Sequence, residues 1–186
     1  MVNYNMRNRT TSLASFTLIE LIIVVGLILL FTGFSISYFS AFTERKKIEN
    51  DSKKIINTLE LMKTKTISGD ASLCSDANPR LSYFSFETNA SNNSYSMVPH
   101  CAVGVPTPIQ YSLETNVLFY YPTPTVDFSV SFQPITGGTD SCSYIYLKNS
   151  LLNNGSGLCR YIKISKSGLV FDDECSTCTT CQNTCP

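Results

Sequence analysis

Residues 17–34 read TLIELIIVVGLILLFTGF, and this stretch decides the fold. Between Phe16 and Thr43, 28 residues contain one charged side chain, Glu20. The run is apolar around the whole circumference of a helix, which is typical of a helix surrounded by lipid rather than one packed on a core. A helix rises about 1.5 Å per residue, so about 20 residues cross a hydrocarbon layer of ~30 Å. We therefore predict a membrane-spanning helix over 16–42, with a buried core helix as the alternative.

The helix is predicted to continue to about Ser68, because no Pro or Gly falls between Phe34 and Ser68. Its second half, 43–68, is amphipathic, and Gly69 is the expected stop. One face of this half must be buried against the rest of the chain. The apolar side chains of that face recur at helical spacing, with two small polar residues between them: Ile48, Ile55, Leu59 and Met62, with Ser52 and Thr66.

Beyond residue 69 the apolar pattern changes to a period of two, as in Phe128, Val130 and Phe132. Turn residues separate several such runs, and no second long amphipathic helix follows. The predicted fold class is therefore α+β, with one long N-terminal helix packed on an antiparallel β-sheet in a domain over 69–174. The expected strands are 81–87, 95–98, 117–121, 127–133, 142–148, 158–165 and 169–171.

The charge balance excludes some functions. Lysines and arginines number 14, aspartates and glutamates also 14, and the formal net charge is zero. A nucleic-acid partner is therefore not expected, since such proteins carry a basic excess. The one histidine, His100, supports neither a hydrolase triad nor a histidine-rich metal site. We predict no enzymatic activity and no cofactor.

The cysteines all lie beyond residue 73, and disulfides are expected among them if this part is exported. The tail over 175–186 has the C-x2-C-x2-C-x3-C-P spacing of bacterial iron–sulfur proteins, but no second such set exists and the tail is rich in Ser and Thr. We favour a disulfide staple, and a thiolate metal site at Cys175, Cys178, Cys181 and Cys185 is the weaker alternative. The eight cysteines are Cys74, Cys101, Cys142, Cys159, Cys175, Cys178, Cys181 and Cys185.

The segment FTLIELIIVVG at 16–26, after a short basic stretch, resembles the N-terminal signal of type IV pilins and type II secretion pseudopilins. The resemblance implies that 1–15 is a prepilin leader. A prepilin peptidase would cut between Ser15 and Phe16, and the new amine of Phe16 would be methylated. Ser15 stands where most members have Gly. In the family, the residue matching Glu20 pairs with the N-terminal amine of a neighbouring subunit during assembly. Independently, a carboxylate in a membrane helix needs a positive partner.

The resemblance implies a structural subunit of a type IV pilus or a type II secretion pseudopilus. Its partners would be other pilin or pseudopilin subunits, the prepilin peptidase, the assembly machinery and the membrane. The expected location is single-pass in the inner (cytoplasmic) membrane with the C-terminal domain outside, at the cell surface or in the periplasm once assembled. The family also raises a calcium site at Asp172-Asp173-Glu174, against a solvated turn. The alternative is a membrane-anchored extracytoplasmic metal, redox or adhesin-like protein that does not polymerise.

Overall fold

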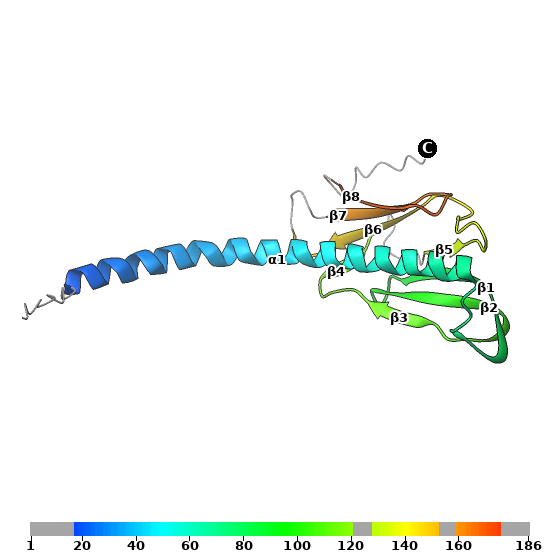
Figure 1. Cartoon of the computed structure of the whole chain (residues 1–186). Coiled ribbons are helices and arrows are strands. Elements are labelled where there is room, and N and C mark those ends of the chain that lie inside the picture. The colour runs from blue at the N-terminus through cyan, green and yellow to red at the C-terminus, as the bar shows by residue number, and fades with distance from the viewer. Residues whose placement is uncertain (1–16, 121–127, 153–158, 176–186) are drawn as a thin grey trace, which may run out of the picture. The chain divides into compact units, whose positions relative to one another are not determined.

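The computed structural model describes residues 17–120, 128–152 and 159–175, apart from the side chains of 34–38. Within these ranges one helix, α1 (Leu18–Ser68), precedes eight strands (Figure 1). The chain divides into two compact units, Met1–Ser40 and Ala41–Pro186, and α1 runs from the first unit into the second. The long N-terminal helix therefore exists, and each unit is described separately.

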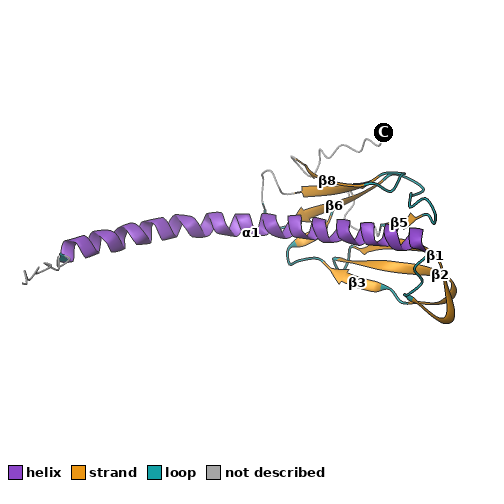
Figure 2. Ribbon diagram, viewed as in Figure 1, coloured by secondary structure: helices purple, strands orange, loops and turns teal. Residues whose placement is uncertain are grey.

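The second unit contains two four-stranded sheets rather than the single sheet that was predicted (Figure 2). All strand pairs are antiparallel, as expected for a chain without βαβ crossovers. The first sheet has the order β3 (Ile109–Ser112), β2 (Ser94–Pro106), β1 (Cys74–Asn89) and β5 (Ser129–Phe132). The second has the order β4 (Val117–Phe119), β6 (Ser143–Asn149), β7 (Cys159–Ile164) and β8 (Val170–Cys175).

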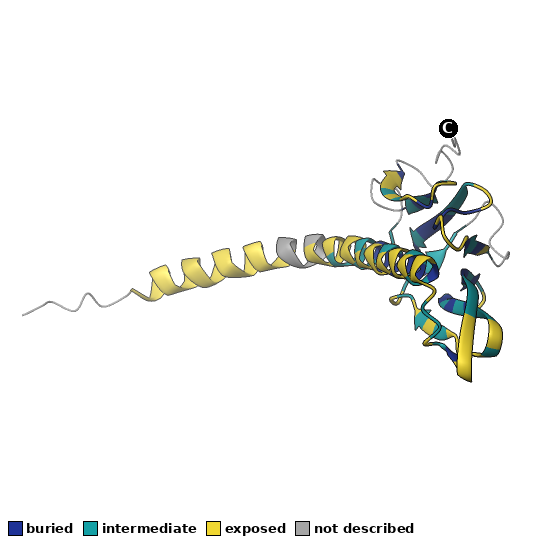
Figure 3. Cartoon of the chain, turned by 45° about the vertical axis from the view of Figure 1, so that its right-hand side comes forward, coloured by how far each residue is buried: buried dark blue, intermediate teal, exposed yellow. Residues whose placement is uncertain are grey.

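The core of the second unit forms where the second half of α1 meets both sheets. The predicted helical stripe is confirmed, since Ile48 is 1% exposed and Ile55, Leu59 and Met62 are fully buried. Alternating residues of the strands complete the same cluster. Figure 3 shows that the second half of α1 carries buried positions, whereas the described part of its first half is exposed. The strand residues of the cluster include Phe84, Phe86, Met97, Phe132, Leu147, Ile162 and Ile164.

Three buried polar side chains tie the second half of α1 to the strands and loops around it. Asn149, fully buried at the end of β6, donates from Nδ2 to the backbone oxygen of Glu44 at 3.1 Å and to its Oε2 at 2.9 Å. Asp51 accepts the backbone N–H of Glu114 at 2.7 Å. Ser52 donates from Oγ to Asp172 of β8 at 2.9 Å. These bonds satisfy groups that would be costly to bury alone, and they define one position of the helix along the strands.

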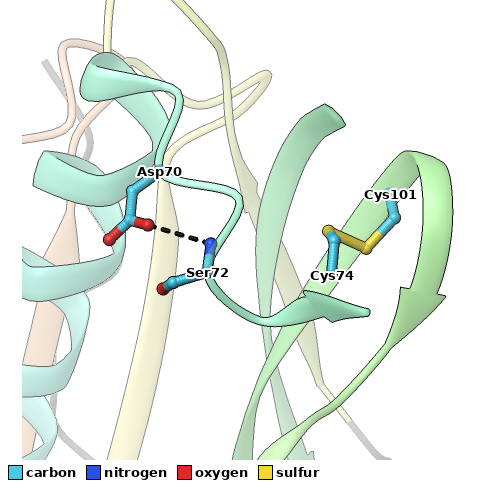
Figure 4. Close-up of a disulfide and its surroundings, with 4 residues drawn as sticks. All are labelled: Asp70, Ser72, Cys74 and Cys101. Atoms are coloured by element: carbon cyan, nitrogen blue, oxygen red, sulfur yellow. Dashed lines mark hydrogen bonds between the residues drawn. A yellow bond between two sulfur atoms is a disulfide. The ribbon is translucent and has the colours of Figure 1, made fainter. Parts of the chain in front are cut away.

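The helix ends where the sequence predicted. Gly69 has φ +65°, its N–H donates to the carbonyl of Thr66 at 3.2 Å, and the N–H of Asp70 donates to the carbonyl of Lys65 at 2.9 Å. This is a Schellman ending, in which a left-handed residue lets two last carbonyls find partners. Asp70 Oδ1 then accepts the N–H of Ser72 at 2.9 Å and turns the chain toward β1 (Figure 4).

The predicted membrane span over 16–42, and with it the single-pass location in the inner membrane, is corrected by the structure. Among the described residues, no helix combines the length and the apolar content needed to cross a bilayer. The run of exposed large apolar side chains from Leu18 reaches Phe31 and is followed by Thr32. Among the residues whose side chains are described, this uninterrupted run covers about 20 Å of helix, against a hydrocarbon layer of ~30 Å. The fold class is α+β, and no membrane-spanning helix is found in the part of the chain that the structure describes.

Candidate functional site

The start of α1 is built by Thr17 and Glu20. Thr17 Oγ1 accepts the backbone N–H of Glu20 at 3.3 Å, and the carbonyl of Thr17 accepts the N–H of Leu21 at 3.2 Å. The pattern T-x-x-E is that of a capping box, of which the structure shows the bond made by Thr17, and a carboxylate in the first turn is favoured by the helix dipole. Thr17 thus has a capping role that the sequence analysis missed, although the four-residue pattern was readable.

The helix then carries an apolar segment, Leu18–Phe31, whose large side chains are exposed. The exposed fraction ranges from 44% at Val24 to 76% at Leu18. Figure 3 shows the described part of the first half of α1 in the colour of exposed residues. Successive helical positions point in all directions, so the exposed apolar surface surrounds the helix axis. The exposed side chains are Leu18, Ile19, Leu21, Ile22, Ile23, Val24, Val25, Leu27, Ile28, Leu29, Leu30 and Phe31.

The apolar segment is large enough to form a stable interface. Its twelve side chains expose on the order of 1,000 Å² of apolar area, whereas the largest patch on a typical monomer is ~300–600 Å². A standard protein interface buries ~800 Å² on each partner. Because the surface is apolar on every side, several neighbouring helices can pack around it, at the 8–10 Å separations typical of ridges-into-grooves packing.

No family model, no curated protein and no solved structure matches this chain.

The predicted processing site lies next to this segment but outside the described residues. Ser15 and Phe16 precede Thr17, the first residue that the structure describes. Cleavage between them and methylation of Phe16 therefore stay predictions.

The cysteines of the described residues are disulfide-bonded. Cys74 at the start of β1 pairs with Cys101 in β2, with a Cα–Cα distance of 5.9 Å (Figure 4). Cys142, Cys159 and Cys175 are also in disulfides. A disulfide sulfur is not a thiolate ligand, so Cys175 does not serve the metal site considered for the tail. The other tail cysteines lie outside the described residues: Cys178, Cys181 and Cys185.

The acidic run 172–174 lies in strand β8, not in the solvated turn that was favoured. Asp172 accepts two bonds from the guanidinium of Arg160, Nε at 3.2 Å and Nη2 at 3.0 Å, besides the bond from Ser52. Glu174 accepts from Arg160 Nη1 at 3.2 Å. Two of the three carboxylates are thus used in binding an arginine of β7, which is a structural role. In the described part of the chain, no group of three or more possible metal ligands gathers.

His100 lies in a small polar cluster on the outer face of the first sheet. Its ring stacks on Tyr83, with centroids 4.2 Å apart, and its Nε2 is 2.8 Å from Ser85 Oγ. Ser85 donates to Glu87 Oε1 at 3.0 Å. In a nucleophilic triad the carboxylate accepts a hydrogen bond from the imidazole. Here the carboxylate of Glu87 accepts its bond from Ser85 instead, so the order of contacts differs from that of a hydrolase.

Proposed function

We propose that this chain is a structural subunit that assembles with other copies, or with related chains, through the apolar segment Leu18–Phe31. The observation that carries the proposal is the exposure of twelve large apolar side chains around one stretch of helix. Burying them against like helices removes this area from water, at about 25 cal/mol per Å². The second unit has its own core and does not depend on this contact for its packing. The resemblance of 16–26 to pilins and pseudopilins supports this mode of assembly.

In such an assembly Glu20 is the ionisable side chain within the segment, and packing would remove it from water. A desolvated carboxylate needs a positive partner. The amine that cleavage would create at Phe16 lies four residues earlier, which is one helical turn. The amine of a neighbouring subunit would supply the partner and would penalise wrongly staggered subunits.

The first experiment measures the N-terminus. The chain is isolated from the cells that naturally make it, and its intact mass is determined. We expect the mass of a chain that begins at Phe16 and carries one added methyl group. A mature protein that retains residues 1–15 would contradict the predicted processing.

The second experiment tests the apolar segment directly. Leu27 is 51% exposed in the segment, and Leu151, 59% exposed between β6 and β7, is its matched control. Leu27→Asp places a carboxylate among packed apolar helices, which costs several kcal/mol. We expect sedimentation and electron microscopy to show assemblies for the wild type and for Leu151→Asp, but not for Leu27→Asp. Equal assembly of all three would exclude this segment as the interface.

A third comparison separates the two roles of Glu20. Glu20→Gln keeps a residue that suits a capping box but removes the charge, whereas Glu20→Ala removes both. If the carboxylate pairs with an amine, both variants assemble poorly while Glu20→Gln retains the helix content in circular dichroism. If only capping matters, Glu20→Gln assembles like the wild type.

A further inference from the structure

A polar cavity of about 260 Å³ lies on the outer face of the first sheet. The register of the strands explains its lining. Gln110 of β3 pairs with Ser96 of β2, Ser96 with Glu87 of β1, and Glu87 with Ser129 of β5. Residues paired directly across an antiparallel sheet point to the same face, so four strands contribute one row of polar side chains. With strands ~4.8 Å apart, the row is about 14 Å long.

A second row lies two residues further along and faces the same way. Asn89 of β1 pairs with Ser94 of β2, and both line the cavity. Gln110 Nε2 donates to Ser94 Oγ at 3.4 Å, which links the two rows. The opposite face of these strands lies in the core, as the burial of Phe86 and Met97 shows. Thr88, Tyr95 and Phe128 also line the cavity, at the side where it borders the core.

Among the described residues that line the cavity, Glu87 is the charged one. Two neighbouring side chains that do not line the cavity, Ser85 and His100, fix its position. Ser85, 1% exposed, donates to Glu87 Oε1 at 3.0 Å, and His100 Nε2 lies 2.8 Å from the same hydroxyl. Among the described residues, Glu87 Oε2 has no hydrogen-bond partner. Oε1 of Glu87 is used by Ser85, so Oε2 is the oxygen that can accept a hydrogen bond from a ligand. The lining described here contains no Lys or Arg, so nothing in it favours an anionic ligand.

From this lining we infer that the cavity binds a small neutral polyhydroxylated ligand, of the size of a single sugar ring. Hydroxyl and amide side chains both donate and accept, which matches a ligand whose hydroxyls do the same. A carboxylate is a strong acceptor for ligand hydroxyls. The volume is below the ~300–1,000 Å³ of pockets that hold drug-sized molecules, and the polar lining disfavours an apolar ligand.

The test is saturation-transfer NMR on the full chain with D-glucose, D-galactose and N-acetyl-D-glucosamine, each at about 10 mM, since weak millimolar binding is readily seen there. Ethanolamine and methyl phosphate, which both carry C–H protons, serve as cationic and anionic probes. We expect transfer to at least one sugar and none to methyl phosphate. Glu87→Gln should weaken binding roughly tenfold or more, because a bond to a charged acceptor becomes a neutral one. Gln110→Ala, on an exposed side chain of β3, should weaken it as well.

Glu60→Gln is the matched control, since Glu60 is exposed on α1 far along the sequence from the cavity residues. It should bind like the wild type. No transfer to any of the three sugars overturns the inference. Transfer that survives both Glu87→Gln and Gln110→Ala places the sugar elsewhere and also overturns it. Binding of ethanolamine in preference to the sugars would mean that the carboxylate selects a cation, which contradicts a neutral ligand.

Discussion

Truncating Leu59 to alanine should destabilise the second unit much more than the same change at Leu61. Leu59 is fully buried in the core between α1 and both sheets, whereas Leu61, two residues later, is 44% exposed. Both changes are Leu to Ala in the same helix, so the difference in helix propensity cancels. What remains is the burial of one side chain and the cavity left behind.

The expected cost follows from the surroundings of Leu59. Leucine-to-alanine changes in cores cost about 2–5 kcal/mol, and the upper part of this range applies where neighbours cannot move in. Here the helix is held by the bonds of Asn149, Asp51 and Ser52, so it cannot shift to fill the space. We expect a loss of about 3–4 kcal/mol for Leu59→Ala and below about 1 kcal/mol for Leu61→Ala.

The measurement is urea unfolding of the wild type and the two variants, followed by circular dichroism with the disulfides intact. The three proteins are compared by their unfolding midpoints, provided that the slope of the free energy of unfolding against urea concentration is the same. A shift of the midpoint without a change of slope reports stability alone. If Leu59→Ala and Leu61→Ala lose the same stability within about 0.5 kcal/mol, the placement of the helix stripe in the core is refuted.

Three further outcomes are expected. Replacing Cys74 and Cys101 by Ser opens a link between residues 27 apart, which should lower the free energy of unfolding by about 3–4 kcal/mol in the loop-entropy account, measured by urea unfolding. Asp51→Ala leaves a backbone N–H before β4 without its acceptor and should cost about 1–3 kcal/mol, whereas the exposed Glu60→Ala should cost less than about 0.5 kcal/mol. The ammonium of Lys65, and then the N–H of Ser72, lower the pKa of Asp70 from 3.8 to about 2. Asp70 therefore stabilises the fold above about pH 4, and this contribution is lost as the pH falls toward 2; Asp70→Asn should flatten this part of a stability–pH profile.

The helix and most strands could be predicted because their signals are local. The spacing of Ile48, Ile55, Leu59 and Met62 identifies one face of a helix, and Gly69 supplies the left-handed residue that ends it. The predicted strand runs overlap seven of the eight strands. The four-residue strand β3 was missed because it is too short to show a period against its polar neighbours.

The pairing of strands could not be predicted, since it depends on contacts between distant residues. For this reason one sheet was expected where two exist, and the polar rows beside Glu87 were not foreseen. The acidic run at 172–174 was misplaced for the same reason, because Arg160 meets it only through the register of β7 and β8. The membrane span was predicted from the length and apolar circumference of 16–42, and no helix among the described residues meets that requirement.

The three polar ties of α1 have a mechanical consequence. Asn149, Asp51 and Ser52 attach one helix to three separate parts of the second unit, within about two turns of helix. A pull along the helix axis would strain these bonds together, rather than breaking them one after another. If the N-terminal end of a subunit is held, tension along α1 therefore reaches the second unit without displacing the helix along the strands.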